Sequence, residues 1–198
     1  MTGFDPVRVI EVLADHGVEF VIIGGFAAEL HGAPIPATQD VDVTPSMAPE
    51  NLARLSSALD DLSARIRVNN EPDGFAFSHD AASLGRARVW NLTCPSGSFD
   101  VTFLPSGTTG YDDLVRSASV LQVHDHPVAV AALADIIRSK EAAGRPKDLA
   151  TLPALTRWLR AVEGVEPAER DRTLADALDR RRRSSSGGGQ GAAGRVKD

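Results

Sequence analysis

Asp40 and Asp42 lie two residues apart in a segment, residues 40–44, that alternates polar and apolar side chains. The alternation predicts a β-strand, in which both carboxylates point to the same face. At about 6 to 7 Å apart along a strand, two negative charges repel each other unless a cation lies between them. Mg²⁺ prefers oxygen ligands and is usually bound by a few carboxylates together with substrate phosphates. A solvated face of an edge strand is the simpler explanation of the pair.

A third carboxylate, Asp100, lies in a second predicted strand, residues 99–104, between apolar neighbours. Buried there without a partner, it would be costly. Placed beside Asp40 and Asp42, it would complete a site for two metal ions, one activating an attacking hydroxyl and the other holding phosphates. A strand residue that faces solvent explains Asp100 equally well.

Two further features fit a phosphorylated ligand. Gly24 and Gly25 follow a predicted strand and precede a short predicted helix, where backbone N–H groups can approach a phosphate, although a tight turn also explains them. Lys140 lies seven residues after Leu133 on the apolar stripe of a predicted helix, so it reaches either the solvent or a site. Charged residues follow at the start of the next predicted helix: Arg145, Lys147 and Asp148.

Strands in the first two-thirds of the chain and helices in the last third indicate an α+β fold. We expect a sheet core at 1–126, a helical C-terminal part at 127–183 packed on the same domain, and a disordered tail at 184–198. The expected strands are 19–23, 40–44, 74–79, 87–94 and 99–104, with a hairpin turn at 95–97. The expected C-terminal helices are 129–143, 146–163 with an irregularity at Pro153, and 167–182.

The 198 residues, 42% hydrophobic and 24% charged, are ordinary for a globular protein. No apolar run reaches the roughly 20 residues of a membrane-spanning helix, no secretory signal is evident, and the single cysteine excludes an internal disulfide. We therefore expect a cytoplasmic protein without a membrane partner.

The net charge is −6, and the segment from Arg180 onward holds six of the 21 cations and one of the 27 anions. The chain before Arg180 is therefore so acidic that it would need a local basic patch to bind nucleic acid. The run Arg180–Arg183 either contacts an RNA backbone or forms a solvated helix end. A second cluster of cations lies between residues 138 and 160: Arg138, Lys140, Arg145, Lys147, Arg157 and Arg160.

Three motifs carry a family resemblance: I-I-G-G-F-A-A-E-L-H-G (22–32), T-Q-D-V-D-V (38–43) and S-K-E-A-A-G-R-P-K-D (139–148). In this order they resemble the polymerase-β-like nucleotidyltransferases, and among these the minimal bacterial branch that contains AbiEii and MenT-type toxins. The resemblance spans roughly residues 18–160. It implies a palm-like mixed sheet that binds an NTP with Mg²⁺, and transfer of a nucleotide, often a pyrimidine, to the 3′ end of tRNA. Such a toxin blocks translation and has a cognate antitoxin.

The resemblance also implies residue roles. Gly24 and Gly25 would contact the triphosphate, Asp40 and Asp42 would hold the metals with Asp100 as the third carboxylate, Lys140 would steady the triphosphate, and Asp148 would orient or activate the acceptor. Pro36 stands where many relatives have an arginine, so either that cationic phosphate contact is missing or Arg145 or Lys147 supplies it. Two alternatives stay open: transfer to a protein or small-molecule hydroxyl, and a catalytically silent nucleotide-binding partner module.

Overall fold

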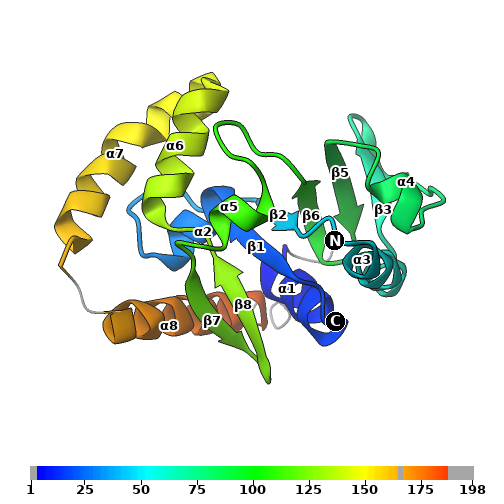
Figure 1. Cartoon of the computed structure of the whole chain (residues 1–198), viewed down its shortest axis with the longest axis horizontal. Coiled ribbons are helices and arrows are strands. Elements are labelled where there is room, and N and C mark those ends of the chain that lie inside the picture. The colour runs from blue at the N-terminus through cyan, green and yellow to red at the C-terminus, as the bar shows by residue number, and fades with distance from the viewer. Residues whose placement is uncertain (1–3, 165–166, 187–198) are drawn as a thin grey trace, which may run out of the picture.

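One mixed β-sheet forms the centre of the structure, a computed structural model that describes residues 4–164 and 167–186. Its strands are β1 (Phe20–Ile23), β2 (Asp40–Pro45), β3 (Arg65–Val68), β4 (Glu71–Phe75), β5 (Val89–Cys94), β6 (Gly97–Thr102), β7 (Ser119–Val123) and β8 (His126–Val130). Their order is β4-β3-β5-β6-β2-β1-β8-β7 (Figure 1). The pairs β1–β8 and β2–β6 run parallel, and the other neighbours run antiparallel.

Helices accompany the sheet along the described chain: α1 (Pro6–Asp15), α2 (Gly24–Leu30), α3 (Pro49–Asp61), α4 (Ala81–Leu84), α5 (Tyr111–Leu114), α6 (Leu133–Ala143), α7 (Pro146–Val162) and α8 (Pro167–Ser186). α6 and α7 lie side by side, and α8 packs against β7 and α2 (Figure 1). The fold is α+β, as the sequence predicts. None of the described helices has the length and apolar character needed to cross a membrane.

The central strand β2 separates the core from the cleft described below. Val41 and Val43 are fully buried on one face, whereas Asp40 and Asp42 on the other face are only half-buried. α1 and α3 pack against each other, and their apolar stripes contribute to the buried core. The alternation read from the sequence therefore places apolar side chains in the core and carboxylates outside it.

Several predicted elements are confirmed and others need correction. The strands at 19–23 and 40–44 and the hairpin turn before Gly97 are present. The helix predicted from residue 129 begins only at Leu133, because 126–130 forms β8 between β1 and β7. The strand predicted at 74–79 ends at Phe75, and β3 was not predicted.

The C-terminal helices are more regular than expected. α7 continues through Pro153. Proline removes the hydrogen bond to the carbonyl of Leu149, but both residues are exposed, so water can satisfy that carbonyl. α8 extends to Ser186, which corrects the start of the expected tail, and 187–198 lie outside the described residues.

Candidate active site

Three aspartates lie together on one face of the sheet. β2 and β6 run parallel, with Asp42 directly beside Asp100, and Asp40 precedes Asp42 by two residues on the same strand. Neighbouring strands are about 4.8 Å apart, so strand pairing alone brings Asp100 next to the Asp40–Asp42 pair. We call these three residues the carboxylate row.

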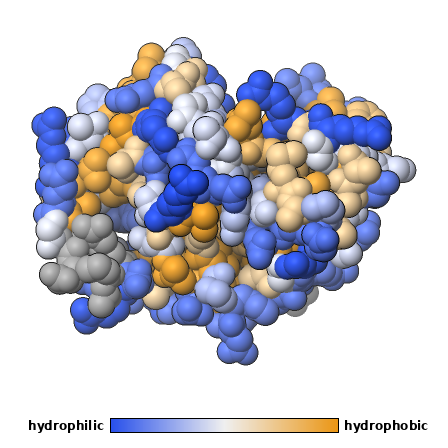
Figure 2. Space-filling view, in the orientation of Figure 1, coloured by the Kyte–Doolittle hydropathy of each residue, from blue (hydrophilic) through white to orange (hydrophobic). Residues whose placement is uncertain are grey.

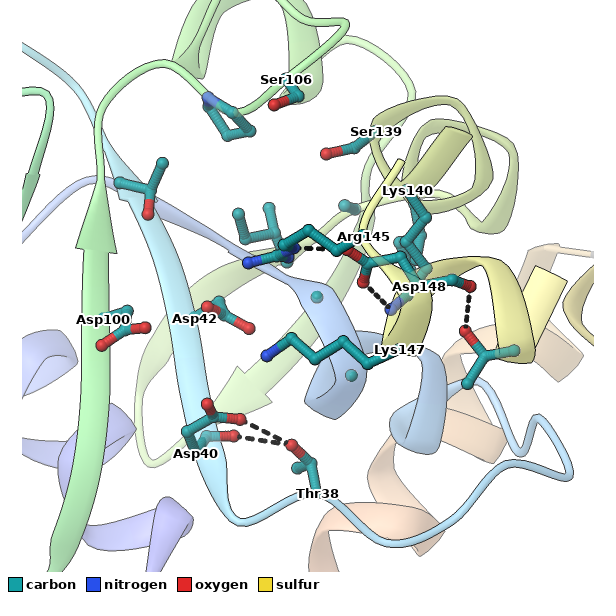
Figure 3. Close-up of a pocket in the computed structure, with 18 of the residues that line it drawn as sticks. Thr38, Asp40, Asp42, Asp100, Ser106, Ser139, Lys140, Arg145, Lys147 and Asp148 are labelled. Carbon is teal, nitrogen blue, oxygen red and sulfur yellow. Dashed lines mark hydrogen bonds and ion pairs between the residues drawn. The ribbon is translucent and has the colours of Figure 1, made fainter. Parts of the chain in front are cut away.

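The carboxylate row lines a cleft of about 880 Å³, within the range of about 300 to 1,000 Å³ typical of small-molecule sites. The sheet forms one wall, and α6 with the start of α7 forms the other (Figure 3). Ser106, from the loop after β6, and Ser139, on α6, also line the cleft (Figure 3). Every site residue predicted from the sequence lines this cleft: Gly24, Gly25, Asp40, Asp42, Asp100, Lys140, Arg145, Lys147 and Asp148.

The two glycines leave the space that neighbouring side chains occupy. Gly24 has φ +70°, and a Cβ added there would lie 2.1 Å from Oδ2 of Asp42. A Cβ added at Gly25 would lie 3.1 Å from Oγ1 of Thr38. In the structure the close neighbours of Gly24 and Gly25 are the side chains of Asp42 and Thr38, and contact of these glycines with a phosphate stays a prediction.

Asp42 has a strongly perturbed charge state. Burial, followed by the negative charges of Asp40 and Asp100, raises its pKa from 3.8 to about 7, although Lys147 and Arg145 offset part of this effect. An ionised carboxylate in such surroundings is unfavourable unless a cation compensates it. The row therefore favours a positively charged ligand.

Hydrogen bonds orient the two outer carboxylates. Thr38 Oγ1 donates to Asp40 Oδ1 at 2.9 Å, and Arg67 Nη2 donates to Asp100 Oδ1 at 2.7 Å. Burial raises the pKa of Asp100, and Arg67 offsets part of that rise. Neither contact was predicted. Thr38 belongs to the T-Q-D-V-D-V motif and was within reach of sequence reasoning, whereas Arg67 lies on β3, which gave no recognisable pattern.

On the opposite wall, Asp148 binds two cations. Its side chain is 2% exposed, and it accepts hydrogen bonds from Lys140 Nζ at 3.0 Å and from Arg145 Nε. Burial alone would raise the pKa of Asp148, but the bonds from Arg145 and Lys140 outweigh it and lower the pKa. Each of its two oxygens binds a cation in the structure, while the role expected from the resemblance, orienting or activating the acceptor, stays a prediction. These contacts make Asp148 an anchor for Lys140 and Arg145.

Two positively charged groups face the carboxylate row. Nζ of Lys147 and the guanidinium of Arg145 point across the cleft toward Asp42, whereas Lys140 points toward Asp148 (Figure 3). Lys147 and Arg145 also lower the pKa of Asp42. The cleft thus has a negative sheet wall and a positive helical wall.

The carboxylate row suits a metal ion that is shared with a ligand. No three His, Cys, Asp or Glu side chains within 4–164 and 167–186 are arranged to hold a metal by themselves. Asp40 and Asp42 offer oxygen donors, while Asp100 is already paired with Arg67. Two carboxylates completed by substrate phosphates are a usual environment for Mg²⁺. The residues therefore fit Mg²⁺ bound together with a phosphate ligand.

Ion pairs neutralise much of the basic cluster predicted at 138–160. Arg138 binds Asp113 and Asp135, and Lys140 and Arg145 share Asp148. Two other arginines of that cluster are exposed on α7: Arg157 and Arg160.

Comparison with known proteins gives distant structural similarity only. No protein-family model and no curated protein matches the chain. A solution structure of the antibiotic-resistance factor ANT(2″)-Ia has a TM-score of 0.47 and 16% identity, and covers 91% of this chain and 94% of that chain. A crystal structure of ANT(2″)-Ia with adenylyl-2″-tobramycin has a TM-score of 0.41 and 13% identity, with 87% and 94% covered.

A third similar structure is an antigenic nucleotidyltransferase-like protein from Paracoccidioides brasiliensis. Its TM-score is 0.44 with 18% identity, over 92% of this chain and 91% of that chain. At such identities and TM-scores no reaction is transferred from these proteins, and function is inferred from the side chains of the cleft.

Proposed function

We propose that the protein is a Mg²⁺-dependent nucleotidyltransferase that moves a nucleoside monophosphate from an NTP to an acceptor hydroxyl. The observation that carries this proposal is the carboxylate row facing Lys147 and Arg145 across one cleft. Carboxylates alone repel a triphosphate, and cations alone give a metal no ligands. Together they match an NTP with its Mg²⁺.

The two walls of the cleft bind different parts of the ligand. Asp40 and Asp42 hold Mg²⁺, and Lys147 and Arg145 contact the phosphates. When bound, Mg²⁺ neutralises the aspartate pair and withdraws negative charge from the triphosphate. Lys140, which the resemblance assigns to the triphosphate, points toward Asp148 (Figure 3), and we assign it to fixing the start of α7 through that ion pair.

Asp100 has a separate role, as the acceptor of the hydroxyl proton. Arg67 compensates the charge of Asp100 and engages its Oδ1, so we assign the metal to Asp40 and Asp42 and the proton to Asp100 Oδ2. A carboxyl whose pKa is raised by burial holds that proton more readily. This assignment replaces the third-ligand role expected from sequence.

The reaction forms and breaks one bond at the α-phosphorus. The acceptor oxygen bonds to that phosphorus, the bond to the β-phosphate oxygen breaks, and pyrophosphate leaves. The hydroxyl proton passes to Asp100. Lys147 and Arg145 offset the charge that develops on the leaving pyrophosphate, so catalysis consists mainly of positioning and charge stabilisation.

Two acceptor classes have support. The 3′ end of tRNA, with inhibition of translation as the outcome, follows from the resemblance, and exposed Arg157 and Arg160 on α7 could contact its backbone. A small-molecule or protein hydroxyl is favoured by a different observation: ion pairs occupy Arg138, Lys140 and Arg145, which leaves few cations for an RNA.

The deciding experiment incubates the protein with Mg²⁺ and each α-labelled NTP in turn, with total tRNA, protein extract or small-molecule extract as acceptor. Asp42→Asn, which keeps the shape of the side chain, is the control. Label in tRNA supports the tRNA acceptor, and growth arrest on expression would then support a toxin. Label in protein or small molecules supports the second class. Mg²⁺-dependent NTP binding without transfer to any acceptor would overturn the proposal in favour of a silent nucleotide-binding module.

A further inference from the structure

Arg181, on the C-terminal helix α8, lies next to the loop that leads into β2. Its side chain is 19% exposed, and its guanidinium lies 5.3 Å from the centre of the Phe4 ring. Nη2 donates to the backbone carbonyl of Thr38 at 3.1 Å, and Nη1 lies 3.6 Å from Oε1 of Glu29. The guanidinium thus bridges α2 and the loop before β2.

Contacts on three sides fix Thr38. Its carbonyl accepts from Arg181, and its N–H donates to Oε2 of Glu29 at 3.4 Å. Its hydroxyl donates to Oδ1 of Asp40 at 2.9 Å (Figure 3). Gly25 leaves room for that hydroxyl, because a Cβ at Gly25 would come within 3.1 Å of it. A continuous series of polar contacts therefore runs from Arg181 to a carboxylate of the row.

The arginine run of α8 is not a free basic patch. Arg182 binds Glu11 at 2.6 Å, and Arg181 is engaged as described, whereas Arg180 and Arg183 are exposed. Buried Leu174 and Leu178 anchor the same helix on the core. The position of Arg181 is therefore set by the fold and does not depend on a bound nucleic acid.

We propose that Arg181 is a positioning residue of the active site, acting through Thr38 to hold the Asp40 carboxylate in the orientation that binds Mg²⁺. The inference rests on the proposed function. It gives α8 an indirect role in the cleft, through Thr38, because Arg181 itself does not line the cleft. A planar guanidinium suits this role because it can donate to two acceptors at once, which an ammonium on a single stem does less well.

Four variants test the link: Arg181→Met, Arg181→Lys, Thr38→Val and the double variant Arg181→Met/Thr38→Val. Arg183→Met, on the exposed side of the same helix, is the matched control. Groups that orient metal ligands typically contribute about 10- to 100-fold to metal affinity. We expect Arg181→Met and Thr38→Val each to raise the Mg²⁺ concentration for half-maximal transfer by about 10-fold or more, with kcat at saturating Mg²⁺ little changed. Arg181→Lys should lie between Arg181→Met and the wild type.

The double variant distinguishes a relay from general loosening of α8. If Arg181 acts through Thr38, the double variant needs no more Mg²⁺ than Thr38→Val alone. Multiplied effects of the two single changes would overturn the proposal. So would an Arg181→Met variant that behaves like Arg183→Met.

Hydrogen exchange gives a second readout that does not depend on transfer. Arg181→Met and Arg181→Lys should speed exchange in residues 33–40, with no such change in Arg183→Met, while exchange within α8 reports whether the helix stays docked. If the wild-type protein transfers nothing, the proposed function fails, and exchange still decides the link. The link between Arg181 and Thr38 is supported if Arg181→Lys exchanges faster in residues 33–40 while exchange within α8 is unchanged. It is overturned if exchange in residues 33–40 equals that of Arg183→Met.

Discussion

Replacing Asp42 by asparagine is expected to stabilise the folded protein at high pH, although it removes a central carboxylate of the site. Burial, together with Asp40 and Asp100, raises the pKa of Asp42 from 3.8 to about 7. A carboxyl with a raised folded pKa binds its proton more tightly in the folded state, so its ionised form opposes folding. The penalty is small below the unfolded value, grows as pH rises from about 4 to 7, and is complete above about 7.

The size of the effect follows from that pKa. The difference of about 3 pH units, at about 1.4 kcal/mol per unit, gives a penalty of roughly 4 kcal/mol for fully ionised Asp42. At pH 5 the penalty is below about 2 kcal/mol. Asparagine keeps the shape beside Gly24 and cannot ionise. At about 2 to 4 °C per kcal/mol for a chain of this size, Asp42→Asn should raise Tm at pH 8 by roughly 8 to 16 °C.

Thermal unfolding of wild type and Asp42→Asn in EDTA, at pH 5 and pH 8, measures the effect. Asp112→Asn is the control, because Asp112 is exposed at the start of α5 and its loss should change Tm little at either pH. Equal Tm values for wild type and Asp42→Asn at pH 8, or the same gain at both pH values, would refute the reasoning.

Three further outcomes are expected. Mg²⁺ added at pH 8 should raise the Tm of the wild type more than that of Asp42→Asn, because the variant lacks the repulsion that the ion relieves; a thermal-shift titration shows this. Gly24→Ala should reduce transfer by about 100-fold, the usual effect of displacing a catalytic group by about 1 Å, because the new Cβ would lie 2.1 Å from Oδ2 of Asp42. Gly164→Ala, also at positive φ but in open space, should be strained yet retain full activity. Asp148→Asn should lower the free energy of unfolding by about 3 kcal/mol at pH 7, because it leaves Lys140 without its carboxylate. Urea unfolding should show that loss fade as pH falls below 3.8, since the folded pKa of Asp148 is lowered.

Sequence periodicity was sufficient to predict the carboxylate face of β2. Alternation fixes which side chains share a face, and buried valines on the other face fix which side is the core. Placing Asp100 beside Asp42 required more than periodicity, because β2 and β6 are far apart in sequence and their register comes from the sheet. The resemblance supplied that pairing, and local pattern alone did not.

Strand and helix boundaries were harder to predict where apolar residues are consecutive. Residues 128–131 read V-A-V-A, a pattern that suits a buried strand as well as the start of a helix. Long-range pairing with β1 and β7 selects the strand. β3, with the sequence R-I-R-V, was not predicted, because two arginines in four residues do not suggest a strand. In the structure this strand positions Arg67 to donate to Asp100.

The charge of the site could not be read from residue counts, because ion pairs decide which charges remain available. Asp148 and Asp42 are both aspartates of one cleft, yet the pKa of Asp148 is lowered and that of Asp42 is raised. On the positive wall Asp148 therefore already compensates Lys140 and Arg145, whereas on the negative wall Asp42 is only partly compensated. Without a ligand, the negative wall carries more uncompensated charge than the positive wall, so the cleft favours a cation over an anion. Under the proposed function, an NTP that arrives with its Mg²⁺ would supply the missing charge to Asp42 and present phosphates to Lys147 in one step, whereas a free triphosphate would first meet repulsion from the carboxylate row.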